Sequence, residues 1–178
     1  MKKYWLLILW SSILVHTLSM IFLLEKLVGN LAWILPVLSL SIFIAIPSVL
    51  ITRLPSSNGG HFVLVSTITS LLSFLMAVLL AISFERFLGI SVLGLVGAVI
   101  CWTFCYTYDR IFLDKHYSPL SIVYLAVGFV AFFLIIRMSE RGDNRVMPLL
   151  IWNFTIGLCI TFSIWRHMET TKPVHGKS

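Results

Sequence analysis

The chain has 178 residues, of which 59% are hydrophobic and 11% charged, and its formal net charge at pH 7 is +6. Soluble domains carry about 25% charged residues, so this composition excludes an ordinary water-soluble fold and predicts an integral membrane protein. The positive charge does not indicate a nucleic-acid partner, because the basic residues stand singly or in pairs at the ends of apolar segments. That placement is typical of residues that set membrane topology.

The first apolar segment, residues 4–24, follows two lysines in the way that the core of a signal peptide does. It continues for about twenty residues, which is enough to span a bilayer, and no small-x-small cleavage pattern follows it. We therefore expect a first membrane span that is retained.

His16 is the only histidine, acid or base that lies well inside a predicted span. Helical spacing places Ser12 and Ser19 on the same face. Intramembrane ionisable residues are candidates for function, so His16 could be a haem or metal ligand or a proton relay. The other interpretation is a neutral imidazole that bonds to a hydroxyl group or a neighbouring helix. We favour this structural interpretation, because no second histidine lies at a matching depth for a bis-histidine haem.

Six segments in all reach the length of a membrane span. They lie at about residues 4–24, 31–52, 62–84, 87–108, 117–137 and 146–166. Charged residues and turn formers separate them, including the glycine-rich stretch 55–60. The prediction is an all-α bundle of six transmembrane helices with short loops, in one domain over residues 1–166. The polar tail, residues 167–178, is expected to be disordered.

The third and fourth spans each carry a stripe of small residues at helical spacing. The stripes consist of Ser66, Ser70, Ser73 and Ala77 in the third span and Ser91, Gly94, Ala98, Cys101 and Cys105 in the fourth. Small residues let membrane helices approach closely, and only a short link joins these two spans. We therefore predict that the two stripes form a helix-packing seam. The opposite, lipid-facing side of the fourth span would consist of Val92, Val96, Val99 and Ile100.

The three cysteines of the chain follow no CxxC or Cys/His pattern. Neither a disulfide framework nor a metal site is predicted from them, and no cofactor is expected. In the sixth span, Asn153, Gly157 and Thr161 recur every four residues, so one face can approach a neighbour and hydrogen-bond to it. Asn153 is, after His16, the second candidate polar site inside the membrane.

A group of histidines and acids falls near one membrane boundary. The group is His61, Asp109, Asp114, His116 and His167. Such residues could form a metal site or an acid–base pair, but their spacing matches no catalytic motif. We treat them as a candidate cluster on the cytoplasmic face.

The orientation follows from the Lys and Arg count. With the amino terminus inside, the cytoplasmic segments hold Lys2, Lys3, Arg53, Arg110, Lys115, Arg166, Lys172 and Lys177. The other side holds Lys26, Arg86, Arg137, Arg141 and Arg145. The excess on the first side predicts that both termini are cytoplasmic, and the plasma membrane is the expected location.

All the carboxylates fall at or beyond the predicted span ends, where they cannot serve as the midplane ligand of an ion-coupled pump. The favoured function is a non-catalytic integral subunit or accessory factor of a larger membrane assembly for transport. Its expected partners are the lipid bilayer and other membrane subunits or a second copy of the chain. The alternatives are a membrane-embedded enzyme or redox protein, which would use His16 or the cytoplasmic-face cluster, and a small stand-alone carrier of uncharged or anionic solutes.

Overall fold

The computed structural model describes residues 2–24, 31–83, 86–114, 120–139 and 146–170. This part of the chain is entirely helical and contains no strand, so the predicted all-α fold is confirmed. The helices are α1 (Lys2–Leu24), α2 (Leu31–Thr52), α3 (Ser56–Ser83), α4 (Arg86–Phe112), α5 (Ser121–Ser139) and α6 (Val146–Thr170).

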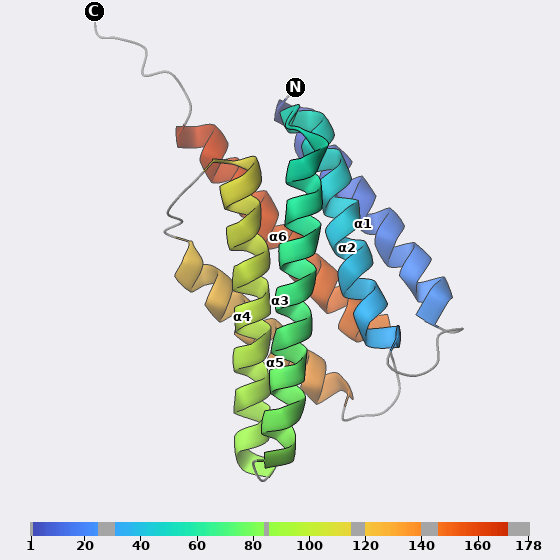
Figure 1. Ribbon diagram of the computed structural model, residues 1–178, viewed down its shortest axis with the longest axis vertical. Coiled ribbons are helices and arrows are strands. Elements are labelled where there is room, and N and C mark those ends of the chain that lie inside the picture. The colour runs from blue at the N-terminus through green and yellow to red at the C-terminus, as the bar shows by residue number, and fades with distance from the viewer. Residues whose placement is uncertain (1, 25–30, 84–85, 115–119, 140–145, 171–178) are drawn as a thin grey trace, which may run out of the picture.

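Each helix packs against the next one along the chain, and α6 returns to pack against α1. The bundle is therefore closed, and α4 and α6 also meet inside it. Successive helices run in opposite directions, so the start of α1 and the end of α6 lie at the same end of the bundle (Figure 1). We call this the terminal end of the bundle.

Among the residues that the structure describes, three helical stretches are long and apolar enough to cross a membrane: Tyr4–Leu23, Ser121–Met138 and Val146–Glu169. A shorter apolar stretch, Ser39–Thr52, lies in α2. A helix rises 1.5 Å per residue, so about 20 apolar residues match the hydrocarbon thickness of a bilayer. These helices indicate a membrane protein, in agreement with the composition.

Large apolar side chains also point outward from every helix. Examples with more than half of their area exposed are Leu7, Leu50, Leu72, Leu95, Ile122 and Phe154, one from each helix in order. A soluble monomer does not expose apolar side chains over its whole circumference. The exterior of the bundle is therefore suited to hydrocarbon.

Aromatic rings hold α3 to α4 inside the bundle. Phe62 at the first turns of α3 lies edge-on to Phe104 and Phe112 of α4, with ring centroids 5.1 Å and 5.5 Å apart. Tyr108 of α4 lies 5.9 Å from the same ring. Edge-to-face pairs of this kind contribute about 0.5–1.5 kcal/mol each beyond burial of area.

The third helix begins earlier than the sequence predicts, because the glycine-rich stretch 55–60 is helical from Ser56 onward. The carbonyl of Pro55 accepts a hydrogen bond from the Asn58 amide at 3.0 Å, which closes the first turn. Proline is common at the start of helices. Gly59 is buried, and a Cβ there would lie 2.9 Å from Val49 Cγ2 of α2. Close packing thus offsets the low helix propensity of glycine.

The helix α4 packs against α3, as the sequence predicted, but its glycines lie against α5. A Cβ added at Gly94 would lie 2.7 Å from the Phe129 ring, and one added at Gly97 would lie 2.1 Å from Phe132 Cβ. On the α5 side, a Cβ at Gly128 would lie 2.5 Å from the Cβ atom of Cys101. Phenylalanine rings of α5 therefore occupy the space that the glycines of α4 leave open.

In α3, one residue of the predicted seam contacts α2 instead of α4. Ser66 is buried against α2, where its Oγ lies 3.0 Å from Ser41 Oγ, and Ser70 bonds to the Ser66 carbonyl of its own helix. Ser73 is half-buried, and the side chains of Ala77 and Ser91 lie outside the described residues.

The prediction that Val92, Val96, Val99 and Ile100 face lipid was wrong for two of these residues. Val99 is 42% exposed, in agreement with the prediction, and the side chain of Val92 lies outside the described residues. Val96 and Ile100 are buried and pack against Trp152 of α6. The reason is that α4 has α3, α5 and α6 as neighbours, so several of its faces are covered. A prediction that considers only one neighbouring helix assigns the other faces to lipid.

Candidate functional site

His16 lies near the middle of α1 and is fully buried. Its Nε2 atom lies 2.8 Å from Ser39 Oγ of α2, and its Nδ1 atom lies 3.1 Å from Asn153 Nδ2 of α6. The ring of Phe43 packs beside the imidazole, with centroids 5.4 Å apart. Both ring nitrogens are therefore engaged, each by a different neighbouring helix.

The hydrogen bonds around the imidazole assign its tautomer. The Asn153 amide donates to Thr17 Oγ1 at 2.9 Å, and the Thr17 hydroxyl donates in turn to a carbonyl one turn back in α1. The second hydrogen of the same amide points to Nδ1 of His16, so Nδ1 accepts and Nε2 carries the proton. Nε2 then donates to Ser39, whose hydroxyl reaches the Pro36 carbonyl at 3.2 Å. This arrangement holds the imidazole in its neutral form.

The predicted polar face of α6 is the face that packs against α1. Besides the contacts of Asn153, the Trp10 indole donates to Thr161 Oγ1 at 2.9 Å. The same indole lies over Gly157, where a Cβ would come within 2.9 Å of the ring. The spacing of Asn153, Gly157 and Thr161 thus predicted this close approach, although it did not indicate which helix would supply the partner.

The sequence predicted that Asp109 lies at a membrane boundary, but the structure buries it inside the bundle. The Tyr124 hydroxyl of α5 donates to its Oδ2 at 2.9 Å and also contacts Ser163 Oγ of α6. One residue earlier in α4, the Tyr108 hydroxyl lies 3.0 Å from Ser48 Oγ of α2. These bonds form a polar layer that joins α2, α4, α5 and α6.

A cluster of three thiols lies next to this layer. Cys101 and Cys105 are one turn apart on α4, and Cys159 comes from α6. The three Sγ atoms lie within 4.8 Å of one another, and all three residues are buried. Each is a free cysteine. We call this group the thiol cluster.

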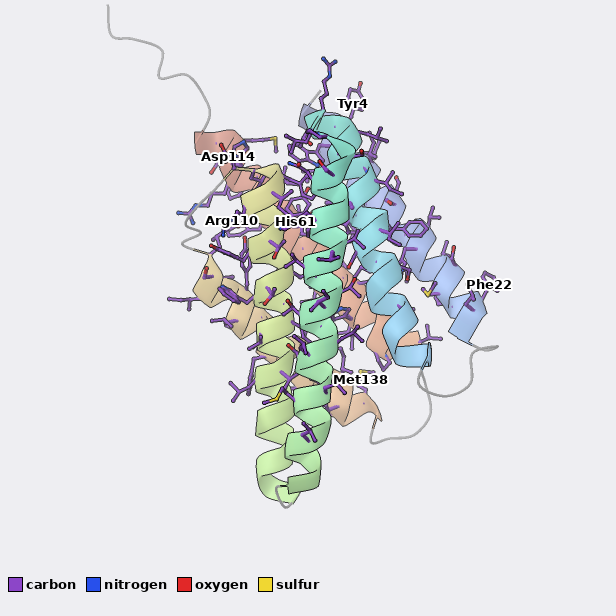
Figure 2. The ribbon with its side chains drawn as sticks, viewed as in Figure 1. Tyr4, Phe22, His61, Arg110, Asp114 and Met138 are labelled. Atoms are coloured by element: carbon purple, nitrogen blue, oxygen red, sulfur yellow. The ribbon has the colours of Figure 1, made fainter. Side chains whose placement is uncertain are left out.

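The described members of the predicted cytoplasmic-face cluster differ in burial and form no group of three that could hold one metal ion. His61 and Asp114 are exposed and His167 is half-buried, while Asp109 is buried, and His116 lies outside the described residues. His61, Arg110 and Asp114 do lie toward the terminal end of the bundle, as Tyr4 does, and Met138 lies toward the other end (Figure 2). Within the part of the chain that the structure describes, the thiol cluster is the only group of three or more such ligands close enough for one metal ion.

The sequence carried a partial signal of the thiol cluster. The i, i+4 spacing places Cys101 and Cys105 on one helix face, and Cys159 lies in another span at a similar distance from the terminal end. What the sequence lacks is the contact between α4 and α6, because these helices are not consecutive. Without that contact the two α4 cysteines appeared only as part of a packing stripe.

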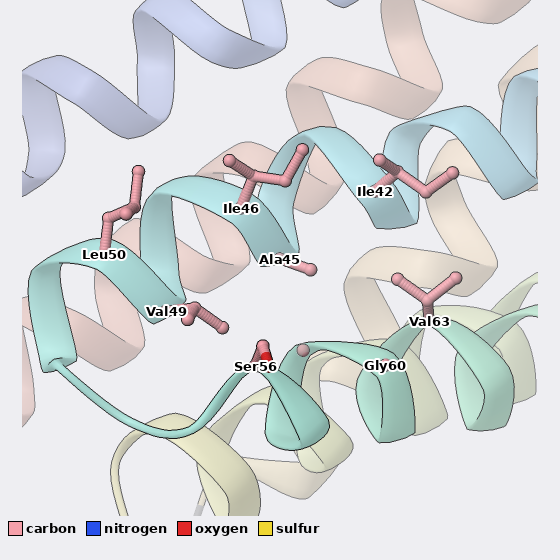
Figure 3. Close-up of a pocket in the computed structure, with 9 residues that line it drawn as sticks. Ile42, Ala45, Ile46, Val49, Leu50, Ser56, Gly60 and Val63 are labelled. Carbon is pink, nitrogen blue, oxygen red and sulfur yellow. The ribbon is translucent and has the colours of Figure 1, made fainter.

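A shallow groove of about 270 Å³ lies between α2 and the start of α3 (Figure 3). Ala45, Val49 and Gly60 line it, with Leu50 toward its edge and Ser56 as a polar contributor. The lining contains no acid, base, histidine or cysteine. This groove suits an apolar chain or helix surface and offers no group for chemistry.

Comparisons of the chain with protein-family models, with curated proteins and with solved structures found no match.

Proposed function

We propose that the chain is a single-domain plasma-membrane protein with six spans and both ends in the cytoplasm. Three of its helices have the length and apolar composition of spans, and all six coincide with apolar segments of the sequence. The alternating helix directions support this proposal, because the start of α1 and the end of α6 lie at the same end of the bundle (Figure 1). The excess of Lys and Arg in the segments on that side favours the cytoplasm.

Within that topology we propose a non-catalytic subunit or accessory factor of a larger membrane assembly, involved in transport. The observation that carries this proposal is the bonding of His16 to two other helices through both ring nitrogens. A histidine held in this way stabilises a scaffold and has no free nitrogen to coordinate a metal ion or a haem iron. The partners would be the surrounding lipid and other membrane subunits or a second copy of the chain.

Native electrophoresis and native mass spectrometry test this proposal on the full-length tagged chain, expressed at its natural level and extracted in mild detergent. We expect one assembly of defined stoichiometry that is larger than the monomer, and we expect His16→Gln to assemble equally well. A chain that runs only as a monomer would contradict the subunit role. So would an activity that His16→Gln abolishes while the fold is retained.

The second candidate is a membrane-embedded enzyme or redox protein, and the buried Asp109 favours it. The Asp109 carboxylate accepts a hydrogen bond from Tyr124 inside the bundle. A buried, hydrogen-bonded carboxylate of this kind is a better candidate for acid–base chemistry than a charge at the membrane boundary. Asp109→Asn separates the two candidates, because the amide keeps an acceptor for Tyr124 but cannot exchange a proton. Normal assembly with a lost cellular function would favour the second candidate, and an unchanged function would favour the first.

A further inference from the structure

The thiol cluster has a composition that packing alone does not require. The chain contains three cysteines, and all of them converge at one place from two helices. Helix packing accounts for a small residue at position 101, because Gly128 of α5 approaches its Cβ atom. Alanine, serine or glycine would serve that purpose equally well. Helix packing gives no reason for two further thiols whose Sγ atoms lie within 4.8 Å of the first.

Three sulfur ligands in a triangle match a soft metal ion. Thiolates select Cu(I) and zinc among the common metals, whereas oxygen ligands select magnesium and calcium. Structural zinc sites are almost always tetrahedral with four ligands. The group that the described residues form has three members. A three-coordinate site therefore favours Cu(I) over zinc.

Cys101 and Cys105 belong to the apolar core, together with Phe104, Ile156 and Ile160. A metal ion held there is shielded from water, and the cysteines bind it as thiolates, the form of the side chain that ligates metals.

On this basis we propose that Cys101, Cys105 and Cys159 form a three-coordinate Cu(I) site inside the membrane bundle. Binding is a ligand exchange with no electron transfer: the ion enters as Cu(I), three Cu–S bonds form, and each of the three thiols releases its proton to become a thiolate. With metal–sulfur distances of about 2.3 Å, a trigonal site needs sulfurs about 4 Å apart. Sulfurs that already lie within 4.8 Å reach this spacing by small side-chain rotations.

The polar layer lies on the side of the cluster that faces the terminal end. Asp109 follows Cys105 by one turn of α4, and Ser163 follows Cys159 by one turn of α6. The Tyr124 hydroxyl connects these two side chains. An acidic, hydroxyl-bearing layer in this position attracts a cation to the cluster from that end of the bundle. The site is independent of the subunit role proposed above, since a scaffold subunit can bind metal or lack it.

The experiment is an anaerobic titration of the purified full chain with Cu(I) against a chromophoric Cu(I) chelator, followed by X-ray absorption. We expect one Cu(I) per chain and a first shell of three sulfurs. Each of the substitutions Cys101→Ser, Cys105→Ser and Cys159→Ser should weaken binding by at least about tenfold, since even outer-shell changes weaken metal sites by about 10–100-fold. Met168→Leu, which removes a partly buried thioether elsewhere in the core, is the matched control and should bind normally.

Three outcomes would overturn the proposal: no Cu(I) retained against the chelator, a first shell of nitrogen or oxygen, or equal binding by all the serine variants. Displacement of Cu(I) by equimolar zinc would overturn the choice of metal. The absorption measurement uses the unsubstituted chain, so the proposal stays testable even where a serine variant does not fold. Retention of normal assembly by a metal-free chain would leave the subunit role intact.

Discussion

In hydrocarbon, an imidazole needs a partner at each ring nitrogen, because no water is present to replace a missing one. His16 meets this need with Ser39 on one side and Asn153 on the other. Three helices that are not all consecutive in the chain are thereby fixed at one depth. The position of a polar residue inside a span thus carries structural information even where it performs no chemistry.

We predict that His16→Gln costs little stability and that His16→Leu costs about 1–2 kcal/mol, the range measured for hydrogen bonds between membrane helices. Glutamine keeps a donor and an acceptor for Ser39 and Asn153, whereas leucine leaves both without this partner. The measurement is the SDS mole fraction at the midpoint of unfolding in mixed micelles. Ser19→Ala is the control, because Ser19 bonds only to a carbonyl of its own helix.

A visible Soret band in the purified chain that disappears in His16→Gln would contradict the structural interpretation. So would a His16→Leu variant that is as stable as Ser19→Ala, because the bonds to α2 and α6 would then contribute nothing measurable.

At the scale of single helices, the contact between α4 and α5 depends on matching small residues with large ones. Gly94 and Gly97 receive the rings of Phe129 and Phe132, and Gly128 receives the side of α4 at Cys101. Dispersion and close packing drive the association of membrane helices, since lipid tails are as apolar as the helix surface. The complementary shape of these two helices therefore decides how they pair.

We predict that Gly97→Ala lowers the free energy of unfolding by about 1–3 kcal/mol, as overpacking does in other cores. The added Cβ would lie 2.1 Å from Phe132 Cβ, an atom that moves only with its backbone, so α4 and α5 must separate. The matched substitution Gly60→Ala meets nothing within 4 Å and should be neutral or slightly stabilising. SDS unfolding midpoints of the two variants compare them directly, and equal midpoints would refute the contact.

The sequence predicted elements well and their partners poorly, and the reason is physical. Length and hydropathy are properties of one segment, so all six helices could be predicted, including α2 with its internal Pro36 and Pro47. Which helices pack together depends on whether the surfaces of two segments are complementary in shape. The stripe at Gly94 correctly indicated a close contact, but the ring that fills it belongs to α5, which the spacing on α4 cannot show.

At the scale of the whole molecule, contacts between non-consecutive helices bring the buried polar and sulfur-containing side chains together. The thiol cluster and the polar layer both depend on α4 meeting α6, and the His16 bonds depend on α6 meeting α1. Closing a bundle of six helices produces these contacts together. A prediction that pairs only neighbouring segments must miss the thiol cluster, and for the same reason it placed Asp109 at the surface.

The proposed topology, six spans with both ends in the cytoplasm, predicts which introduced cysteines can be labelled from outside the cell. In a chain whose native cysteines are replaced by alanine, single cysteines are introduced by Ser57→Cys, Asn144→Cys or Ser178→Cys. A membrane-impermeant maleimide should label only position 144 in intact cells. In the six-span topology one span, α6, separates position 144 from position 178, so these two positions lie on opposite sides of the membrane. Four spans separate positions 57 and 178, so these two lie on the same side. Positions 57 and 178 should react only after permeabilisation, since the Lys and Arg excess keeps their side in the cytoplasm. Reaction of 57 and 178 from opposite sides would require an odd number of crossings between them and would refute the topology.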